Sequence, residues 1–301
     1  MKIRIGARGS PLSLAQTELV AASLRSRAEV EIVPISTTGD RLSNIGAGMT
    51  GKDLFTREID DALLAGRIDI GVHSLKDLPS RLPAGLVLAA VPPREDPRDV
   101  LVSRHRRSLG SLPRGARVGT ASARRRAQIL SARPDAEVLD ARGNVDTRLR
   151  RLNEGRWDAI VLARAGLARL GLLGEITEAL PVSVMLPAVG QGALAVVVRE
   201  DDGDVRERIA PLDDPGSHCE AVAERTLLEL LEAGCRAPVA GLARVEDGAL
   251  RLAGAVFAPD GSRTLRAEAS GTESNPAALG REVARLLLEQ GAAELIALAR
   301  G

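Results

Sequence analysis

The chain has almost no aromatic residues. Its 301 residues include no tyrosine, two phenylalanines and one tryptophan. Hydrophobic residues still make up 45% of the sequence, so its cores must be built from leucine, valine, isoleucine and alanine, over a length sufficient for two or three packed domains. Proteins that hold single-stranded nucleic acid stack its bases on aromatic side chains, and this composition argues against that class.

Cysteine, histidine and long apolar runs are also scarce. Cys219 and Cys235 fit neither a disulfide framework nor a four-ligand zinc site. His73 and His105 lack partners at metal-ligand or triad spacing, so we expect structural roles for them and no metal. No apolar run approaches the roughly 20 residues that a membrane span needs, and the first five residues resemble a strand more than a signal peptide. These features predict a soluble, cytoplasmic protein without a membrane partner.

The charges nearly cancel, because 41 Lys and Arg residues face 40 Asp and Glu residues and leave a net charge of +1. A nucleic-acid-binding domain carries a basic excess, so the composition favours a small target. Only three of the cations are lysines: Lys2, Lys52 and Lys76.

Arginines gather at two predicted strand-to-helix junctions, residues 119–126 and 142–148. A helix N-terminus exposes unpaired N–H groups, and a guanidinium beside it binds carboxylate or phosphate oxygens in pairs. The pattern predicts a polyanionic ligand. The alternative is a solvated helix face, and since three consecutive side chains point in three directions, Arg124, Arg125 and Arg126 cannot all face one ligand.

The first two hundred residues follow one α/β plan twice. The segment Gly155-Arg156-Trp157-Asp158 echoes Gly66-Arg67-Ile68-Asp69, and Ala127-Gln128 echoes Ala15-Gln16. Chance similarity in an Ala- and Arg-rich chain is one interpretation. Two related α/β domains facing one cleft is the interpretation we favour. Ligands of such sheets bind beyond the carboxyl ends of the strands, where we expect Arg8, Asp40, Lys76, Asp77, Ser122, Arg124 and Arg142.

The remaining segments predict two crossings and a third domain. Residues 85–97 and 187–193 look like crossings between the α/β domains, and a strand follows at 194–199. After Pro215 the pattern predicts a separate α+β domain, with a helix over 220–232, strands at 239–245, 250–257 and 264–269, and a final helix after Asn275-Pro276.

Two single residues stand out for their chemistry. Asp77 follows a predicted buried strand and lies beside Lys76; it forms either a solvated ion pair or a carboxylate that stabilises developing positive charge. Cys235 lies on a loop beside Arg236; it is either a small buried hydrophobic residue or a reactive thiol. Both alternatives stay open on chemistry alone.

Taken in order, the motifs resemble those of the porphobilinogen deaminase (hydroxymethylbilane synthase) family over nearly the whole chain. The matching segments are 8–12 with Gln16, 51–55, 73–79, 95–99, the two arginine junctions, 186–193, and Gly234-Cys235 with Pro238. Each segment is short, but their order and spacing together are highly specific.

The resemblance implies the fold and the domain boundaries. It implies two α/β domains like those of type II periplasmic binding proteins around a hinged cleft, plus a smaller C-terminal α+β domain. The expected ranges are 1–97 with 193–212, 98–192, and 213–301.

The resemblance also implies a transferase of tetrapyrrole (haem) biosynthesis. Family members join four porphobilinogen molecules head to tail with loss of ammonia, on a dipyrromethane cofactor held by a thioether, and release hydroxymethylbilane by hydrolysis. Cys235 matches the cofactor cysteine, and Asp77 matches the catalytic aspartate. Further cofactor contacts are expected at Lys76, Asp77, Ser122, Arg124, Arg125 and Arg142, substrate contacts at Arg8, Ser10, Phe55, Thr120, Arg142, Arg148, Arg169 and Gln191, and an active-site loop residue at Lys52.

Some positions depart from the family pattern. Gly48 replaces a loop lysine of some relatives, and Asp146 replaces a common glycine between Arg142 and Arg148, so the loop and the second arginine site differ from the family pattern. The resemblance suggests a monomer that passes its product to the next pathway enzyme. The rival interpretation is a hinged binding protein for a small dicarboxylate or oxyanion, which would need neither Cys235 nor a third domain.

Overall fold

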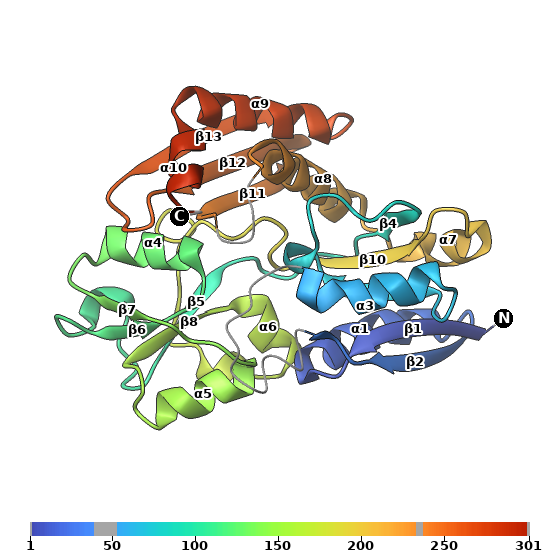
Figure 1. Ribbon diagram of the computed structural model, residues 1–301, viewed down its shortest axis with the longest axis horizontal. Helices are drawn as coiled ribbons and strands as arrows, with labels where there is room; N and C mark the ends of the chain where they lie inside the picture. The colour runs from blue at the N-terminus through green and yellow to red at the C-terminus, as the bar shows by residue number, and fades with distance from the viewer. Residues whose placement is uncertain (1, 39–52, 233–236, 300–301) are drawn as a thin grey trace. The chain divides into compact units, whose positions relative to one another are not determined.

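The computed structural model describes residues 2–38, 53–232 and 237–299, apart from the side chains of residues 53–55. The chain divides into two compact units, residues 1–95 with 193–221 and residues 96–192 with 222–301. Each unit contains a five-stranded sheet, and the second also contains a three-stranded sheet (Figure 1).

The first unit is a three-layer α/β structure. Its sheet has the order β2-β1-β3-β10-β4. Core residues of α1 and α7 pack on one face, and those of α3 pack on the other. The strands are β1 (Lys2–Arg8), β2 (Glu29–Ile35), β3 (Ile70–Ser74), β4 (Leu86–Ala90) and β10 (Leu194–Arg199); the helices are α1 (Pro11–Leu24), α3 (Asp53–Leu64) and α7 (Gly203–Ile209).

The second unit repeats this topology in its larger sheet, whose order is β7-β6-β8-β5-β9. In each sheet one strand is antiparallel to both of its neighbours: β10 in the first and β5 in the second. Each of these strands directly follows a crossing. The strands are β5 (Asp99–Ser103), β6 (Arg117–Gly119), β7 (Glu137–Leu139), β8 (Ala159–Ala163) and β9 (Glu178–Ala179); the helices are α4 (Ala123–Ala132), α5 (Val145–Asn153) and α6 (Arg164–Arg169). The expectation of two related α/β folds is confirmed.

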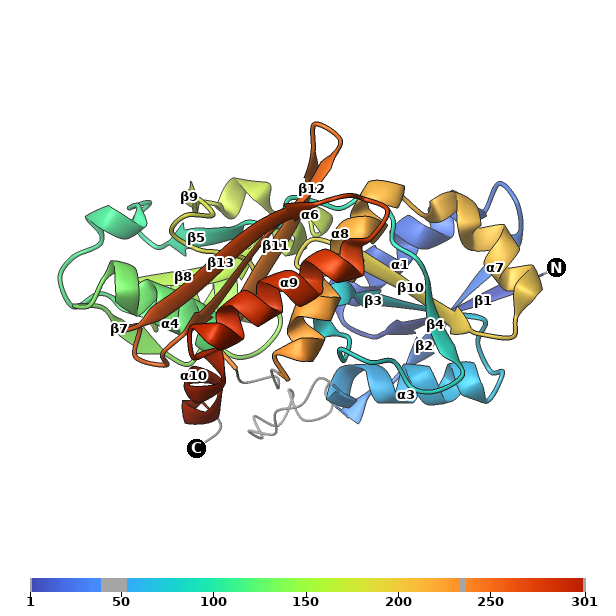
Figure 2. The same ribbon diagram turned by 90° about the horizontal axis from the view of Figure 1, so that it is seen from above.

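The C-terminal part is an antiparallel sheet covered by helices, as expected for an α+β domain. Its strands are β11 (Val239–Glu246), β12 (Ala249–Phe257) and β13 (Thr264–Gly271), and its helices are α8 (Pro215–Leu230), α9 (Pro276–Glu289) and α10 (Ala292–Leu298). Helix α9 runs along one face of this sheet (Figures 1 and 2). The other face shares a core cluster with Ala127 of α4 and with Leu186, through Ala240, Leu242, Ala255 and Phe257. The arginine-bearing helix is therefore fixed against two sheets.

Two sequence expectations are wrong in detail. Residues 86–90 belong to a strand, β4, and the crossing is confined to the residues after it. Helix α8 begins at Pro215 and not near Glu220, because Asp214 caps it by accepting the Ser217 N–H at 2.7 Å and proline suits the first helical position. The proposed boundary between the second and third domains is not tested by this division and stays a prediction.

The repeated Gly-Arg-x-Asp segment has a structural role. Asp69 accepts the Arg4 backbone N–H at 2.8 Å and its side-chain Nε–H at 3.0 Å. Asp158 accepts the corresponding groups of Arg117 at 2.8 and 3.5 Å. Gly66 and Gly155 both have positive φ, 65° and 82°, a conformation that favours glycine. In each sheet, the aspartate just before one strand (β3 or β8) thus binds an arginine near the start of the neighbouring parallel strand (β1 or β6).

His73 lies in β3 with 5% of its surface exposed. Burial, with the charge of Arg8 adding to it, lowers the pKa of His73 from 6.5 to about 4. The ring Nε2 lies 4.0 Å from Asp60 Oδ1, too far for a hydrogen bond. The folded chain therefore holds this histidine neutral near pH 7.

This burial predicts an acid sensitivity. Below pH 6.5 the unfolded chain binds a proton that folded His73 resists until about pH 4, so the free energy of unfolding should fall by about 3 kcal/mol over that interval. His73→Gln should remove this part of the fall, as measured by urea denaturation between pH 7 and pH 4. The exposed His105 provides a control: His105→Gln should follow the wild-type curve. A wild-type pH dependence in His73→Gln would contradict the assignment.

Candidate functional site

Asp77 lies on a short 3-10 turn, η1 (Leu75–Asp77), directly after β3. The Leu75 N–H donates to the Ala193 carbonyl at 3.0 Å, and Leu75 and Leu78 are 2% and 1% exposed. Two buried leucines thus anchor the turn. The Asp77 carboxylate is half-buried and makes no ion pair or hydrogen bond with another side chain among the described residues, so it is available to a ligand. Lys76 beside it is also half-buried.

Arg8 and Ser10 lie at the same edge of the first sheet as the turn. Arg8 is the last residue of β1, which runs parallel to β3, so the carboxyl ends of the two strands are adjacent. Ser10 caps α1 by accepting the Ser13 N–H at 3.3 Å, and Ser13 Oγ accepts the Arg8 N–H at 3.2 Å. Gln16 of α1 donates to Ser74 Oγ at 2.8 Å, which ties α1 to the end of β3.

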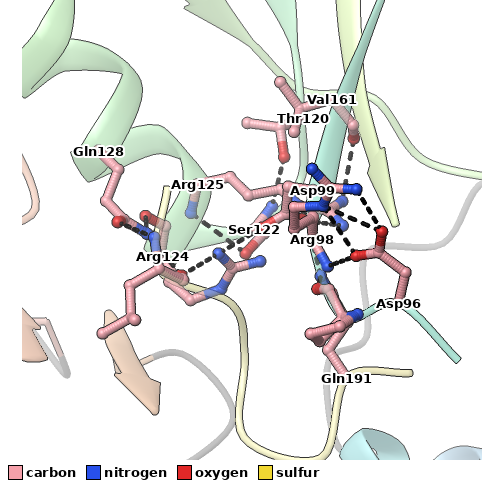
Figure 3. A network of polar contacts seen from close by, with 12 residues as sticks. Asp96, Arg98, Asp99, Thr120, Ser122, Arg124, Arg125, Gln128, Val161 and Gln191 are labelled. Atoms are coloured by element: carbon pink, nitrogen blue, oxygen red, sulfur yellow. Dashed lines mark hydrogen bonds and ion pairs between the residues drawn. The ribbon is translucent and has the colours of Figure 1, made fainter. Parts of the chain in front are cut away.

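In the second unit, a buried carboxylate organises the first arginine junction (Figure 3). Asp99 at the start of β5 is fully buried, and Arg124 and Arg125 are 4% and 7% exposed. Asp99 Oδ2 accepts from Arg124 Nη1 at 2.7 Å, and Oδ1 accepts from Arg125 Nε at 2.9 Å. Gln191 Nε2 donates to the same Oδ1 at 3.0 Å.

The charges in this cluster support one another. Burial alone would raise the pKa of Asp99, but the charges of Arg124 and Arg125, with hydrogen bonds from Arg124 and Gln191, outweigh it and hold that pKa well below its usual range. Asp99 therefore stays ionised. Since one carboxylate faces two guanidiniums, the cluster carries one net positive charge in a buried setting.

The other residues of this junction occupy the N-terminus of α4. Ser122 caps the helix by accepting the Arg125 N–H, and its own N–H donates to Thr120 Oγ1 at 3.2 Å. Thr120 is 3% exposed. Arg126 is exposed and donates to the Val138 carbonyl at 2.6 Å, so it lies apart from the buried pair.

The second arginine junction is more open. Arg142 is exposed and donates to Asp140 Oδ2 at 2.7 Å, and Arg148 Nε donates to the Gly143 carbonyl at 2.7 Å. Asp146, the departure from the family pattern, lies in the first turn of α5. An acidic residue there is favourable to the helix dipole, which gives it a helix-stabilising role.

Gln191 and Arg169 fix the return crossing to the second unit. Gln191 is 1% exposed and donates to the Pro97 carbonyl at 2.6 Å as well as to Asp99. Arg169 Nη2 donates to the Gly192 carbonyl at 2.6 Å. Both residues were expected to contact substrate; the structure shows them holding backbone, and their substrate contacts stay predictions.

Three expected site residues, Asp40, Lys52 and Cys235, lie outside the described residues, as does the side chain of Phe55.

One residue of the site, Asp99, was not expected there. It lies in the family-like segment 95–99, but no role was predicted for it. A signal was present, since Asp99 precedes the apolar run Val100 to Val102, which predicts a buried strand and therefore a buried carboxylate in need of cationic partners.

No described helix is long and apolar enough to cross a membrane.

Known proteins similar to this chain agree with the motifs. Residues 3–207 match the family model described as the porphobilinogen deaminase dipyrromethane cofactor binding domain, and residues 218–289 match the porphobilinogen deaminase C-terminal domain. A protein named porphobilinogen deaminase from Thermus thermophilus is 50% identical over 300 residues, covering 98% of both chains. Another from Syntrophobacter fumaroxidans is 47% identical over 298 residues, covering 98% of this chain and 96% of its own.

Solved structures give weaker similarities. The VFT2 domain of BvgS from Bordetella pertussis is 15% identical with a TM-score of 0.43, covering 69% of this chain and 85% of that one. The alkanesulfonate-binding protein SsuA from Xanthomonas axonopodis pv. citri is 18% identical with a TM-score of 0.39, covering 76% and 74%. The family assignment rests on the sequence matches alone, and by these the chain belongs to the porphobilinogen deaminase family.

Proposed function

We propose that Asp77 is the catalytic carboxylate of hydroxymethylbilane synthesis in this chain and that Cys235 holds the dipyrromethane cofactor. The activity and the cofactor are those of the family. The observation that carries the role of Asp77 is its half-buried carboxylate on an anchored turn, where no other described side chain neutralises it.

The role of Asp77 follows from the charge that develops on substrate. Loss of ammonia from the aminomethyl group of porphobilinogen leaves a cationic pyrrole, and a fixed carboxylate stabilises that cation more than it stabilises the neutral substrate. Because Leu75 and Leu78 hold the turn, Asp77 needs little reorganisation to do so. When a ring carbon of the acceptor pyrrole bonds to the methylene carbon that lost ammonia, that ring carbon must lose its proton, and the same carboxylate can accept it.

The cationic residues suit a ligand that carries many carboxylates. Every pyrrole bears acetate and propionate groups, and the bound dipyrromethane supplies the first pyrroles to which substrate is joined. The buried Nε of Arg124 has no hydrogen-bond partner among the described residues, and the Asp99 cluster retains one net positive charge. Both observations fit a carboxylate. We assign cofactor binding to Lys76, Asp77, Ser122, Arg124 and Arg142, with Arg125 contributing through its ion pair with Asp99. We assign substrate binding to Arg8, Ser10, Phe55, Thr120, Arg142, Arg148, Arg169 and Gln191, with Lys52 on the active-site loop.

Localisation, oligomeric state, domain division and product transfer are proposed from the resemblance to the family. We propose a cytoplasmic monomer, divided at residues 97, 192 and 212, with a hinge between the α/β domains and product transfer to the next enzyme of the pathway. Binding to nucleic acid or membrane is not part of this function.

The cofactor assignment predicts a covalent adduct. Intact-mass measurement of the purified protein should show a dipyrrole on Cys235, and Cys235→Ser should lack it. Cys219, which is 8% exposed on α8, provides the matched control, because Cys219→Ser should keep the adduct. A hinged binding protein for a small dicarboxylate would carry an unmodified thiol even after exposure to porphobilinogen, and that result would reject the enzyme assignment.

The catalytic assignment predicts that Asp77→Ala keeps the adduct and the folded far-UV spectrum but loses at least about 100-fold in kcat, since a fixed charge aimed at the transition state is removed. Steady-state product formation from porphobilinogen measures this. Asp61→Ala, at an exposed position of α3, should keep wild-type kcat. Wild-type turnover in Asp77→Ala would rule out the assigned role.

A further inference from the structure

The two buried arginines use their donors differently. Arg125 presents Nε and Nη2 to the same oxygen of Asp99, at 2.9 and 2.7 Å, and its Nη1 donates to the Val161 carbonyl at 3.0 Å. The edge that would bind a carboxylate in a bidentate manner, Nε with Nη2, is therefore already occupied by the protein's own carboxylate.

Arg124 is held from the opposite end. Its Nη1 donates both to Asp99 Oδ2 and to the Leu186 carbonyl, each at 2.7 Å. Its Nε is buried and has no partner among the described residues. Asp99 thus holds Arg124 by one terminal nitrogen and leaves the buried Nε–Nη2 edge unpaired among the described residues. This edge matches two carboxylate oxygens.

Asp99 is itself held rigidly. It starts β5, where it pairs with Ala163 of β8, and Gln191 Nε2 donates to its Oδ1. The neighbouring acid, Asp96, is paired with Arg98 at 2.6 Å. Asp99 is therefore the carboxylate that sets the positions of both guanidiniums (Figure 3).

We propose that Asp99 is a positioning residue for ligand binding: it holds Arg125 as a support and orients the unpaired edge of Arg124 toward one carboxylate of the polypyrrole. The proposal rests on the proposed function, since it takes the ligand to be the carboxylate-bearing cofactor. Binding of the ligand carboxylate then depends more on the orientation of the Arg124 guanidinium than on the total positive charge of the cluster.

Orientation and charge predict opposite effects of Asp99→Asn. The substitution removes a negative charge and raises the net charge of the cluster from one to two. If only charge mattered, the cofactor's carboxylate would bind more strongly. If Asp99 positions Arg124, the guanidiniums separate and the carboxylate binds more weakly.

The test compares thermal unfolding of holoprotein and of apoprotein made without porphobilinogen, with loading checked by intact mass. A ligand that binds the folded state raises the unfolding midpoint, so the holo-minus-apo difference reports its contacts. We expect Asp99→Asn to reduce this difference to about half of the wild-type value or less. A difference equal to or larger than that of wild type would overturn the proposal.

Asp158→Asn provides the matched control, because Asp158 forms an ion pair with Arg117 in the same sheet but at the opposite ends of the strands. A purely structural loss lowers the midpoints of holo- and apoprotein equally, so this variant should keep the wild-type difference.

If Asp99→Asn does not fold, Asp99→Asn with Arg125→Gln keeps one net positive charge and should show the same reduced difference. An unchanged difference in that double variant would also overturn the proposal. Absence of any adduct in the wild-type protein would instead reject the proposed function itself.

Discussion

The second unit depends on the ion pairs that the fully buried carboxylate of Asp99 forms with Arg124 and Arg125. Two guanidiniums that are 4% and 7% exposed can be buried there because Asp99 compensates part of their desolvation. Removing one member of such a buried group leaves an uncompensated charge, at a cost of about 3–5 kcal/mol. Through Arg124, Arg125 and Gln191, this one carboxylate joins helix α4, strand β5 and the return crossing.

The fold could be predicted where local patterns determine it. Strand β10 has the predicted bounds, 194–199, because a continuous apolar run defines it. The prediction failed at β4, where a strand between Gly85 and two prolines was taken for a linker. A strand that lies at the edge of its sheet has half-buried positions, so its sequence carries a weaker periodic signal.

The site could be predicted only as a set of residue types. Asp77 was found because it follows a predicted buried strand, and the arginine junctions were found because they lie between predicted strands and helices. The different roles of Arg124 and Arg125 could not be found in this way, because their partner is a carboxylate 25 and 26 residues away that β5 brings to α4. Helical spacing gives the direction of a side chain, but which of its nitrogens a distant residue occupies depends on tertiary packing.

The two related sheets show how one framework supports different chemistry. The Leu75 N–H bonds to the Ala193 carbonyl in the first sheet, and the Arg164 N–H bonds to the Arg98 carbonyl in the second, so the segments after β3 and β8 are fixed in the same way. The first carries Lys76 and Asp77, whereas the second carries Ala165 and Gly166. Conversely, the junction before α1 has Ser13 where the junction before α4 has Arg125: each is the third residue of its helix and donates its N–H to the capping serine. Because backbone contacts fix both junctions, their side chains can differ without altering the sheet. This independence lets one unit carry the half-buried carboxylate of Asp77 and the other a buried guanidinium pair.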